Sequence, residues 1–171
     1  MIRKIVIAAL SFVLTLTSFA QDTSELARRN GFKDIKLGSP VDSIKGVIFV
    51  KDIAELKEFE AKLYEVKNPQ YEKIGEAEVK GVELKAYRGL IYEIIVTTLK
   101  DPRIMRGLEK SFGKATYNIR TETYAWRVPD QISLVYKGYH KELKLMYKSH
   151  PVIKSMYADK KKKIEEIADD F

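Results

Sequence analysis

Residues 121–148, TETYAWRVPDQISLVYKGYHKELKLMYK, hold three segments in which apolar and polar side chains alternate. The segments are Thr121–Val128, Ile132–Lys137 and Lys141–Lys148, and the Pro-Asp and Gly-Tyr pairs between them are typical of turns. A period of two places one set of side chains on a packed face and the other on a face that meets water. The stretch therefore predicts three antiparallel strands, with a packed face of Tyr124, Trp126, Val128, Ile132, Leu134, Tyr136, Leu143, Leu145 and Tyr147.

A second group of strands is predicted upstream. Ala77 and Val79 alternate with charged residues, Gly81 interrupts the pattern, and alternation resumes over Val82–Tyr87. An Arg-Gly turn leads into Ile91–Leu99, which is rich in β-branched residues and almost continuously apolar. Such a segment is typical of a strand in the centre of a sheet.

The second face of this predicted sheet is our candidate binding surface. Lysine stems with interspersed Tyr, Val and Met side chains are typical of a surface that docks a partner. An ordinary solvated sheet face also carries single apolar residues, so that alternative stays open. The candidate residues are Lys85, Tyr87, Val135, Lys137, Lys144, Met146 and Lys148.

Proline at a first helical position predicts three helices. One begins at Ser39-Pro40 and ends near Gly46, one runs from Asp101-Pro102 to a closing Gly113, and the last begins at Pro151. A fourth, amphipathic helix is predicted from apolar residues spaced by three and four, namely Ile53, Leu56, Phe59, Leu63 and Val66.

Helices followed by strands, twice along the chain, indicate an α+β domain. We expect an antiparallel sheet with helices packed on one face, and the same order allows two helix-then-meander halves. Residues 21–171 are expected to form a single domain, of which 151–171 is a helical C-terminal segment.

The first twenty residues have the order of a secretory signal peptide. Arg3-Lys4 precedes an apolar run over Ile5–Leu16, and Ser18 and Ala20 stand at −3 and −1 of a cut before Gln21. The apolar run is too short to span a membrane. We therefore expect a cleaved leader, 1–20, and a periplasmic or secreted protein.

Composition narrows the classes of function. The chain has no cysteine, so a disulfide framework and a lipidated N-terminal cysteine are excluded, and we expect a soluble protein that is not a lipoprotein. Loss of Arg3 and Lys4 with the leader lowers the formal net charge from +7 to +5. A mildly basic exported protein suits an acidic protein or an anionic surface, and nucleic acid is not expected as a partner.

No constellation of residues in the sequence indicates catalysis. His140 and His150 lack the tight spacing of a metal motif, and no Gly-x-Ser-x-Gly elbow or phosphate-binding glycine loop is present. A glycosidase pair of carboxylates is not excluded, but nothing singles one out. We assign no catalytic, cofactor-binding or metal-binding residue and expect no cofactor.

The segment Phe32–Ile44 combines a short strand, a glycine and a capped helix. With Leu108–Ala115, Tyr124-Ala125-Trp126 and Ile132–Tyr136, it resembles uncharacterised exported proteins of Gram-negative bacteria. The helix-then-meander plan also resembles the β-lactamase inhibitor protein fold and the small lipoprotein of the outer-membrane barrel assembly machinery. The resemblance covers most of Phe32–Lys148 and implies an α+β fold that binds a protein of the envelope. It transfers no site residue, and the chain lacks the cysteines of both families.

The sequence therefore predicts a non-enzymatic exported binding or accessory protein of the bacterial cell envelope. Two alternatives remain. A small secreted hydrolase or inhibitor-like effector requires converging carboxylates or a histidine in a pocket. A small apolar-ligand carrier requires a cavity between the helices and the sheet.

Overall fold

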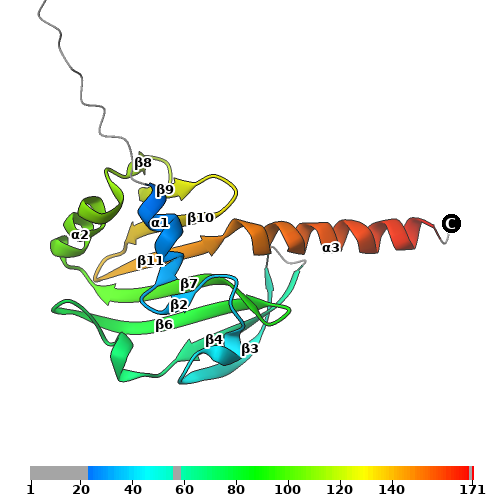
Figure 1. Ribbon diagram of the computed structural model, residues 1–171, viewed down its shortest axis with the longest axis horizontal. Helices are drawn as coiled ribbons and strands as arrows, with labels where there is room; N and C mark the ends of the chain where they lie inside the picture. Colours follow the sequence, from blue (N-terminus) through cyan, green and yellow to red (C-terminus); the bar gives the residue numbers. More distant parts are fainter. Residues whose placement is uncertain (1–22, 56–58, 170) are drawn as a thin grey trace, which may run out of the picture.

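The computed structural model describes residues 23–55, 59–169 and 171. Within them, an antiparallel sheet forms the body, and the last of three α-helices projects away from it (Figure 1). The predicted α+β class is confirmed, whereas the expected leader, residues 1–20, lies outside the described residues. In chain order the elements are α1 (Thr23–Arg29), β1 (Gly31–Phe32), β2 (Ile35–Lys36), η1 (Val41–Ser43), β3 (Val47–Glu55), β4 (Phe59–Val66), η2 (Pro69–Tyr71), β5 (Lys73–Ile74), β6 (Ala77–Tyr87), β7 (Leu90–Leu99), α2 (Pro102–Phe112), β8 (Thr116–Asn118), β9 (Thr123–Val128), β10 (Ile132–Gly138), β11 (Glu142–Ser149) and α3 (His150–Ala168).

The main sheet has nine strands in the described chain. Eight of them follow the order β3-β4-β6-β7-β11-β10-β9-β8, and β5 pairs beside β6. The strand β7 was predicted to be central, and it lies fourth in this order. The three strands of the predicted meander are confirmed as β9, β10 and β11, which pair with one another in register. The short edge strand β8 was not predicted.

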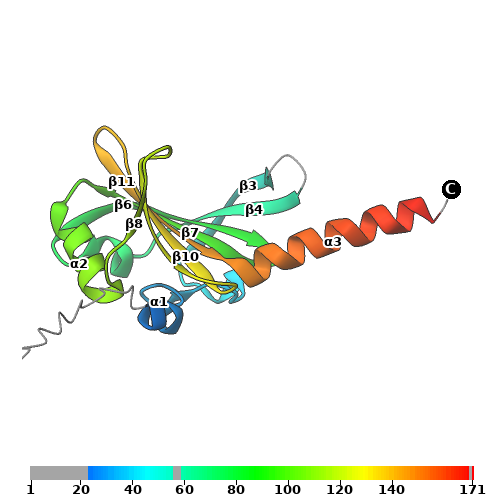
Figure 2. The same cartoon turned by 90° about the horizontal axis from the view of Figure 1, so that it is seen from above.

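The helices α1 and α2 cover one side of the sheet, which we call the helix face (Figure 2). Leu26 of α1 and Ile104 and Phe112 of α2 belong to the same buried cluster as the inward side chains of the strands. Trp126 of β9 is fully buried there, and its indole N–H donates to the carbonyl of Gly113 at 2.7 Å. The packed face predicted from the alternation is confirmed, with the partly exposed Tyr124 at its margin.

The opposite side of the sheet, which we call the open face, is covered only at one end by α3 among the described helices. Val152 and Met156, in the first two turns of α3, pack against Phe59, Ala61 and Tyr92 of the strands. The prediction that the helices pack on one face therefore holds for α1 and α2 but not for α3. The apolar residues of α3 near its start are buried, whereas those near its end, such as Ile164 and Ile167, are exposed.

The amphipathic helix predicted over Ile53–Val66 is wrong, because this part of the chain is the antiparallel pair β3 and β4. Phe59 and Ala61 alternate with charged residues, and Ile53 is the cross-strand partner of Ala61. Phe59, Ala61 and Leu63 fit a period of two, whereas Val66 belongs to the buried cluster of the opposite face, and pairing with β6 selects the strand. Leu56 lies outside the described residues.

Of the helices predicted at Asp101-Pro102 and Ser39-Pro40, the first is confirmed and the second is only a short turn. The helix at Asp101-Pro102 is confirmed, with the Asp101 carboxylate accepting from a backbone N–H at 2.8 Å and Gly113 closing it at φ 74°. The helix predicted after Ser39 is reduced to the 3-10 turn η1. Its flanks are held by β7 instead, since Ile91 N–H donates to the carbonyl of Ser39 at 3.0 Å. The first half nevertheless has a helix, α1, ahead of the meander β3-β4-β6-β7, and the second half has α2 ahead of β8-β9-β10-β11, so both halves have the order of helix then meander.

Candidate functional site

The candidate surface lies on the open face. Strand register pairs Val135 with Met146 and Lys137 with Lys144 across β10 and β11. Lys148 and Lys85 are both paired with the same residue of β7, Glu93. Paired residues point to the same side of a sheet, so six of the seven predicted residues are brought together on this face. Tyr87, the seventh, also lies on it but under α3.

An apolar row crosses the middle of the open face. Ile95 of β7 is paired with Met146, Met146 with Val135, and Val135 with Ala125 of β9. Neighbouring strands lie about 4.8 Å apart, so this row over four strands is about 14 Å long. Ile95 and Ala125 were not predicted, because Ile95 sits in an almost wholly apolar segment where alternation gives no signal. Ala125 could have been found from its place between Tyr124 and Trp126.

Two further rows flank the apolar row. On one side Thr97, Lys144, Lys137 and Thr123 are paired in sequence across the same four strands. The Nζ atoms of Lys137 and Lys144 lie 5.6 and 5.8 Å from the ring centroid of Tyr139, which is 44% exposed. Within the described residues, neither lysine has a carboxylate within 4 Å. This row therefore presents two uncompensated positive charges beside an apolar strip.

The row on the other side is electrically compensated. Glu93 is 3% exposed, and its carboxylate lies 3.0 Å from Lys85 and 3.2 Å from Lys148. The Nζ atom of Lys85 also donates to Glu55 at 2.5 Å. Lys85 and Lys148 were predicted as part of a binding face, but in the structure both neutralise a buried carboxylate. Their charge is therefore less available to a partner than that of Lys137 and Lys144.

The pKa values of two members of this ion cluster, Glu55 and Lys85, are shifted toward the charged forms. Burial raises the pKa of Glu55, but the hydrogen bond and charge of Lys85 outweigh burial and leave it below its usual range. Burial lowers the pKa of Lys85, and the two glutamates more than offset this, so its pKa lies above its usual range. Tyr92 is buried beside them, and burial together with the charge of Glu55 raises the pKa of its hydroxyl. Glu55 and Lys85 are thus both charged at neutral pH beside the neutral phenol of Tyr92.

Tyr87 holds α3 in place. Its hydroxyl donates to Asp159 at 2.8 Å, and Arg88 lies 3.0 Å from the same carboxylate. The ring packs with the apolar cluster between α3 and the strands. Burial, with the neighbouring Asp159 carboxylate, raises the pKa of this hydroxyl. Tyr87 is therefore a residue that attaches the helix, and it lies outside the uncovered part of the open face.

The two histidines lie at opposite ends of β11. His140 is exposed in the turn before this strand, and His150 follows the strand's last residue. The ring of His150 lies 3.2 Å from the hydroxyl of Ser133, which is itself 7% exposed. Within the described residues, the His150 ring has no carboxylate within 4 Å, and no group of three metal-ligating side chains occurs. A serine nucleophile needs a base that a third group orients, and this pair lacks that third group.

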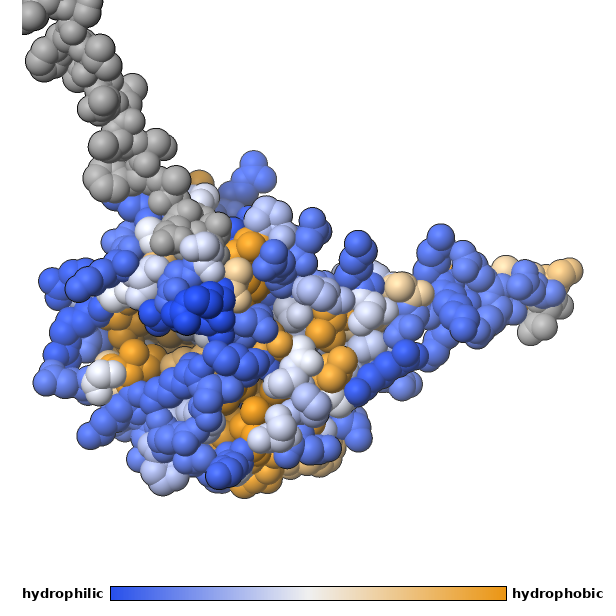
Figure 3. All heavy atoms as spheres, in the orientation of Figure 1, coloured by the Kyte–Doolittle hydropathy of each residue, from blue (hydrophilic) through white to orange (hydrophobic). Residues whose placement is uncertain are grey.

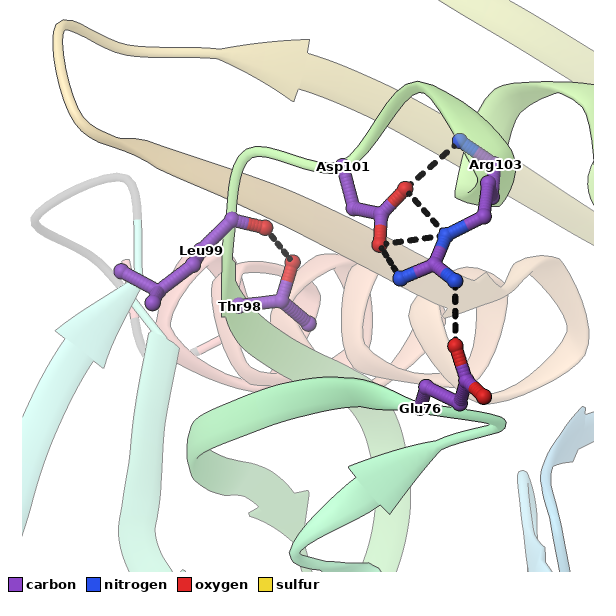
Figure 4. Close-up of polar contacts among 5 residues, drawn as sticks. All are labelled: Glu76, Thr98, Leu99, Asp101 and Arg103. Atoms are coloured by element: carbon purple, nitrogen blue, oxygen red, sulfur yellow. Dashed lines mark hydrogen bonds and ion pairs between the residues drawn. The ribbon is translucent and has the colours of Figure 1, made fainter.

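A cleft of about 600 Å³ lies between α2 and the helix face of the sheet. At one end of it, Arg103 links α2 to the β5–β6 turn (Figure 4). Its guanidinium lies 2.8 Å from the Asp101 carboxylate and 2.5 Å from Glu76. The hydroxyl of Thr98, just before α2, donates to the Leu99 carbonyl at 2.8 Å. A hollow between helices and sheet is the feature that the carrier alternative requires.

Comparison with known proteins gives no relative. No protein-family model, curated protein or solved structure matches the chain. Among the described residues, none of the helices is both long enough and apolar enough to cross a membrane.

Proposed function

We propose that this chain is a non-enzymatic binding protein of the bacterial cell envelope that docks a protein partner on its open face. The observation that carries the proposal is the row of Ile95, Met146, Val135 and Ala125, which lies between two rows that contain lysines. A dry apolar centre with a polar margin is the usual anatomy of a protein interface.

The charges of the face indicate the chemistry of the partner. Lys137 and Lys144 are uncompensated among the described residues, so a matching surface carries carboxylates on that side. Met146 in the centre adapts its flexible thioether to an irregular partner surface. The exposed Tyr139, beside both lysines, extends the contact with a rigid ring at low entropic cost. The partner is therefore an envelope or extracellular protein with an apolar patch next to acidic groups.

Location in the envelope is supported by the sequence of residues 1–20, in which basic, apolar and small residues follow in the order of an export signal. The absence of cysteine in the whole chain fits a fold that depends on its apolar core in an oxidising compartment.

The test is a cross-linking pull-down of the tagged protein from envelope and medium fractions, read by mass spectrometry. The variant is K137E/K144E, because these lysines have no buried carboxylate to satisfy. Reversal of Lys148 would instead place a glutamate against Glu93 and damage the fold. The matched control is K161E/K162E, which reverses two exposed lysines of α3 that each lie near a glutamate of their own helix.

The proposal predicts one dominant partner that K137E/K144E loses and K161E/K162E keeps. Equal loss in both double variants would indicate general attraction to an anionic surface and would contradict docking on this face. Absence of any specific partner from both fractions would also count against the proposal.

A further inference from the structure

The cleft on the helix face has apolar walls and an open mouth. Ile104, Leu108 and Phe112 of α2 form one wall, and Leu145 and Tyr147 of β11 with Phe32 form the floor and the opposite wall. In Figure 3 apolar surface is visible in a hollow on the left of the molecule, between polar side chains above and below it. Its volume of about 600 Å³ lies within the usual range of sites for small ligands.

Gly107 is the second feature of the cleft. It lies inside α2, where glycine lowers helix stability by about 1 kcal/mol relative to alanine. A Cβ atom at this position would meet no atom within 4 Å, so no neighbour requires the missing side chain. Gly107 lines the cleft, and a side chain here would extend into open space. The helix is therefore weaker than alanine would make it at a position where a larger residue has room beside the cleft.

Tyr147 is the third feature. The residue is 5% exposed and lines the cleft. Burial raises the pKa of this hydroxyl, so it stays protonated and remains a donor at neutral pH. The hydroxyl is therefore a donor on the cleft wall that a ligand carboxylate can accept from.

The charges differ between the two ends of the cleft. At the α2 end, Arg103 faces two carboxylates, Asp101 and Glu76, and the charge of Arg106 also acts on Asp101, so the charges at that end are balanced. At the α1 end, Arg29 lies over the Phe112 ring and Lys33 over the Phe32 ring, with 5.5 and 5.7 Å to the centroids.

The positive charge at the α1 end is only partly compensated. Arg29 shares the carboxylate of Glu25 with Arg28, and hydrogen bonds from these two arginines lower the pKa of Glu25 to about 2. Lys33 donates to the backbone carbonyl of Gln70, and its charge acts on the neighbouring Asp34 carboxylate. Lys36 adds a further positive charge and donates to the backbone carbonyls of Arg29 and Lys33. The α1 end is therefore the end that attracts an anion.

We propose that this cleft binds a linear fatty acid. The acyl chain lies along the apolar wall of α2, and the carboxylate is placed toward Arg29 and Lys33, within reach of the Tyr147 hydroxyl. This site is on the opposite side of the sheet from the proposed docking surface, so either proposal can fail while the other stands.

The experiment is titration calorimetry of the purified protein with decanoate and with 1-decanol, which has the same chain and no charge. The variant G107L puts a side chain across the mouth and, because leucine is the better helix former, leaves the protein at least as stable to urea. The variant G107A is the matched control, since a methyl group leaves the mouth open. The variant R29Q/K33Q removes the charge at the α1 end.

The proposal predicts saturable binding of one decanoate per chain, with 1-decanol at least fivefold weaker. G107L weakens decanoate at least tenfold, whereas G107A stays within twofold of the parent protein. R29Q/K33Q weakens decanoate at least fivefold and leaves 1-decanol unchanged. Absence of saturable binding, or decanoate binding that G107L does not alter, would overturn the proposal. Equal affinity for decanoate and 1-decanol would overturn the role of the charged end.

Discussion

Replacement of Lys85 by methionine tests the ion cluster beneath the open face. In the structure Lys85 lies between Glu55 and Glu93, and Glu93 is 3% exposed. Removal of one partner from a buried ion pair costs about 3–5 kcal/mol. Lys148 still lies 3.2 Å from Glu93, and the Lys85 side chain is 22% exposed. Because this partner and some solvent remain, we expect K85M to lower the free energy of unfolding by about 2–3 kcal/mol.

The assay is urea unfolding followed by fluorescence of Trp126, the single tryptophan of the chain, which is fully buried. The expected loss corresponds to a fall in the melting temperature of roughly 5–10 °C for a domain of this size. The control K161M removes an exposed ion pair on α3 and is expected to cost less than about 0.5 kcal/mol. The double variant K85M/E93M, which buries two apolar side chains in place of the pair, is expected to recover most of the stability. A loss below about 0.5 kcal/mol in K85M would refute this reasoning, since Glu93 would then need no such partner.

Three further predictions concern stability. The pKa of Glu55 is below its usual range in the folded state, so its contribution to the free energy of unfolding is complete above about pH 5 and is lost as the pH falls. The free energy of unfolding, measured between pH 7 and pH 3, should therefore fall less steeply with pH for E55Q than for the parent protein, and equal slopes would contradict this. Truncation of Trp126 to phenylalanine removes the hydrogen bond to the Gly113 carbonyl and part of the core, with an expected cost of about 2–3 kcal/mol in thermal unfolding. Gly46 has φ 81°, and a Cβ there would lie 2.3 Å from a backbone oxygen. G46A should therefore lower the melting temperature. An unchanged melting temperature would show that this turn relaxes freely.

The sequence predicted the part of the fold in which one periodicity dominates. In the meander of β9, β10 and β11, alternation alone places Trp126 and Leu145 in the core and Met146 on the opposite face. In β4 the spacing of Phe59, Leu63 and Val66 fits one face of a helix, whereas the strand places Phe59 and Val66 on opposite faces, and pairing with β6 decides between the two. Local pattern carries no information on such contacts, so the hairpin was missed.

The candidate surface was also predicted from the alternation of residues, which does not reveal contacts between distant segments. Alternation places Val135, Lys137 and Lys144 on one face, and the register confirms their proximity. The shielding of Lys85 by Glu93 depends on a register shift between β6 and β7, which no sequence pattern reveals. The cover that α3 provides over Tyr87 depends on the direction in which the last helix leaves the sheet (Figure 1).

The most direct test of the docking proposal is site-specific photo-cross-linking in cells that express the protein. One photoreactive residue replaces Val135, in the centre of the apolar row, and a second replaces Arg106, which is exposed on α2 at the opposite side of the sheet. The account predicts one discrete adduct of defined mass from position 135 and none of that mass from position 106. The same adduct from both positions, or an adduct from position 106 alone, would contradict the assignment of the open face as the binding surface.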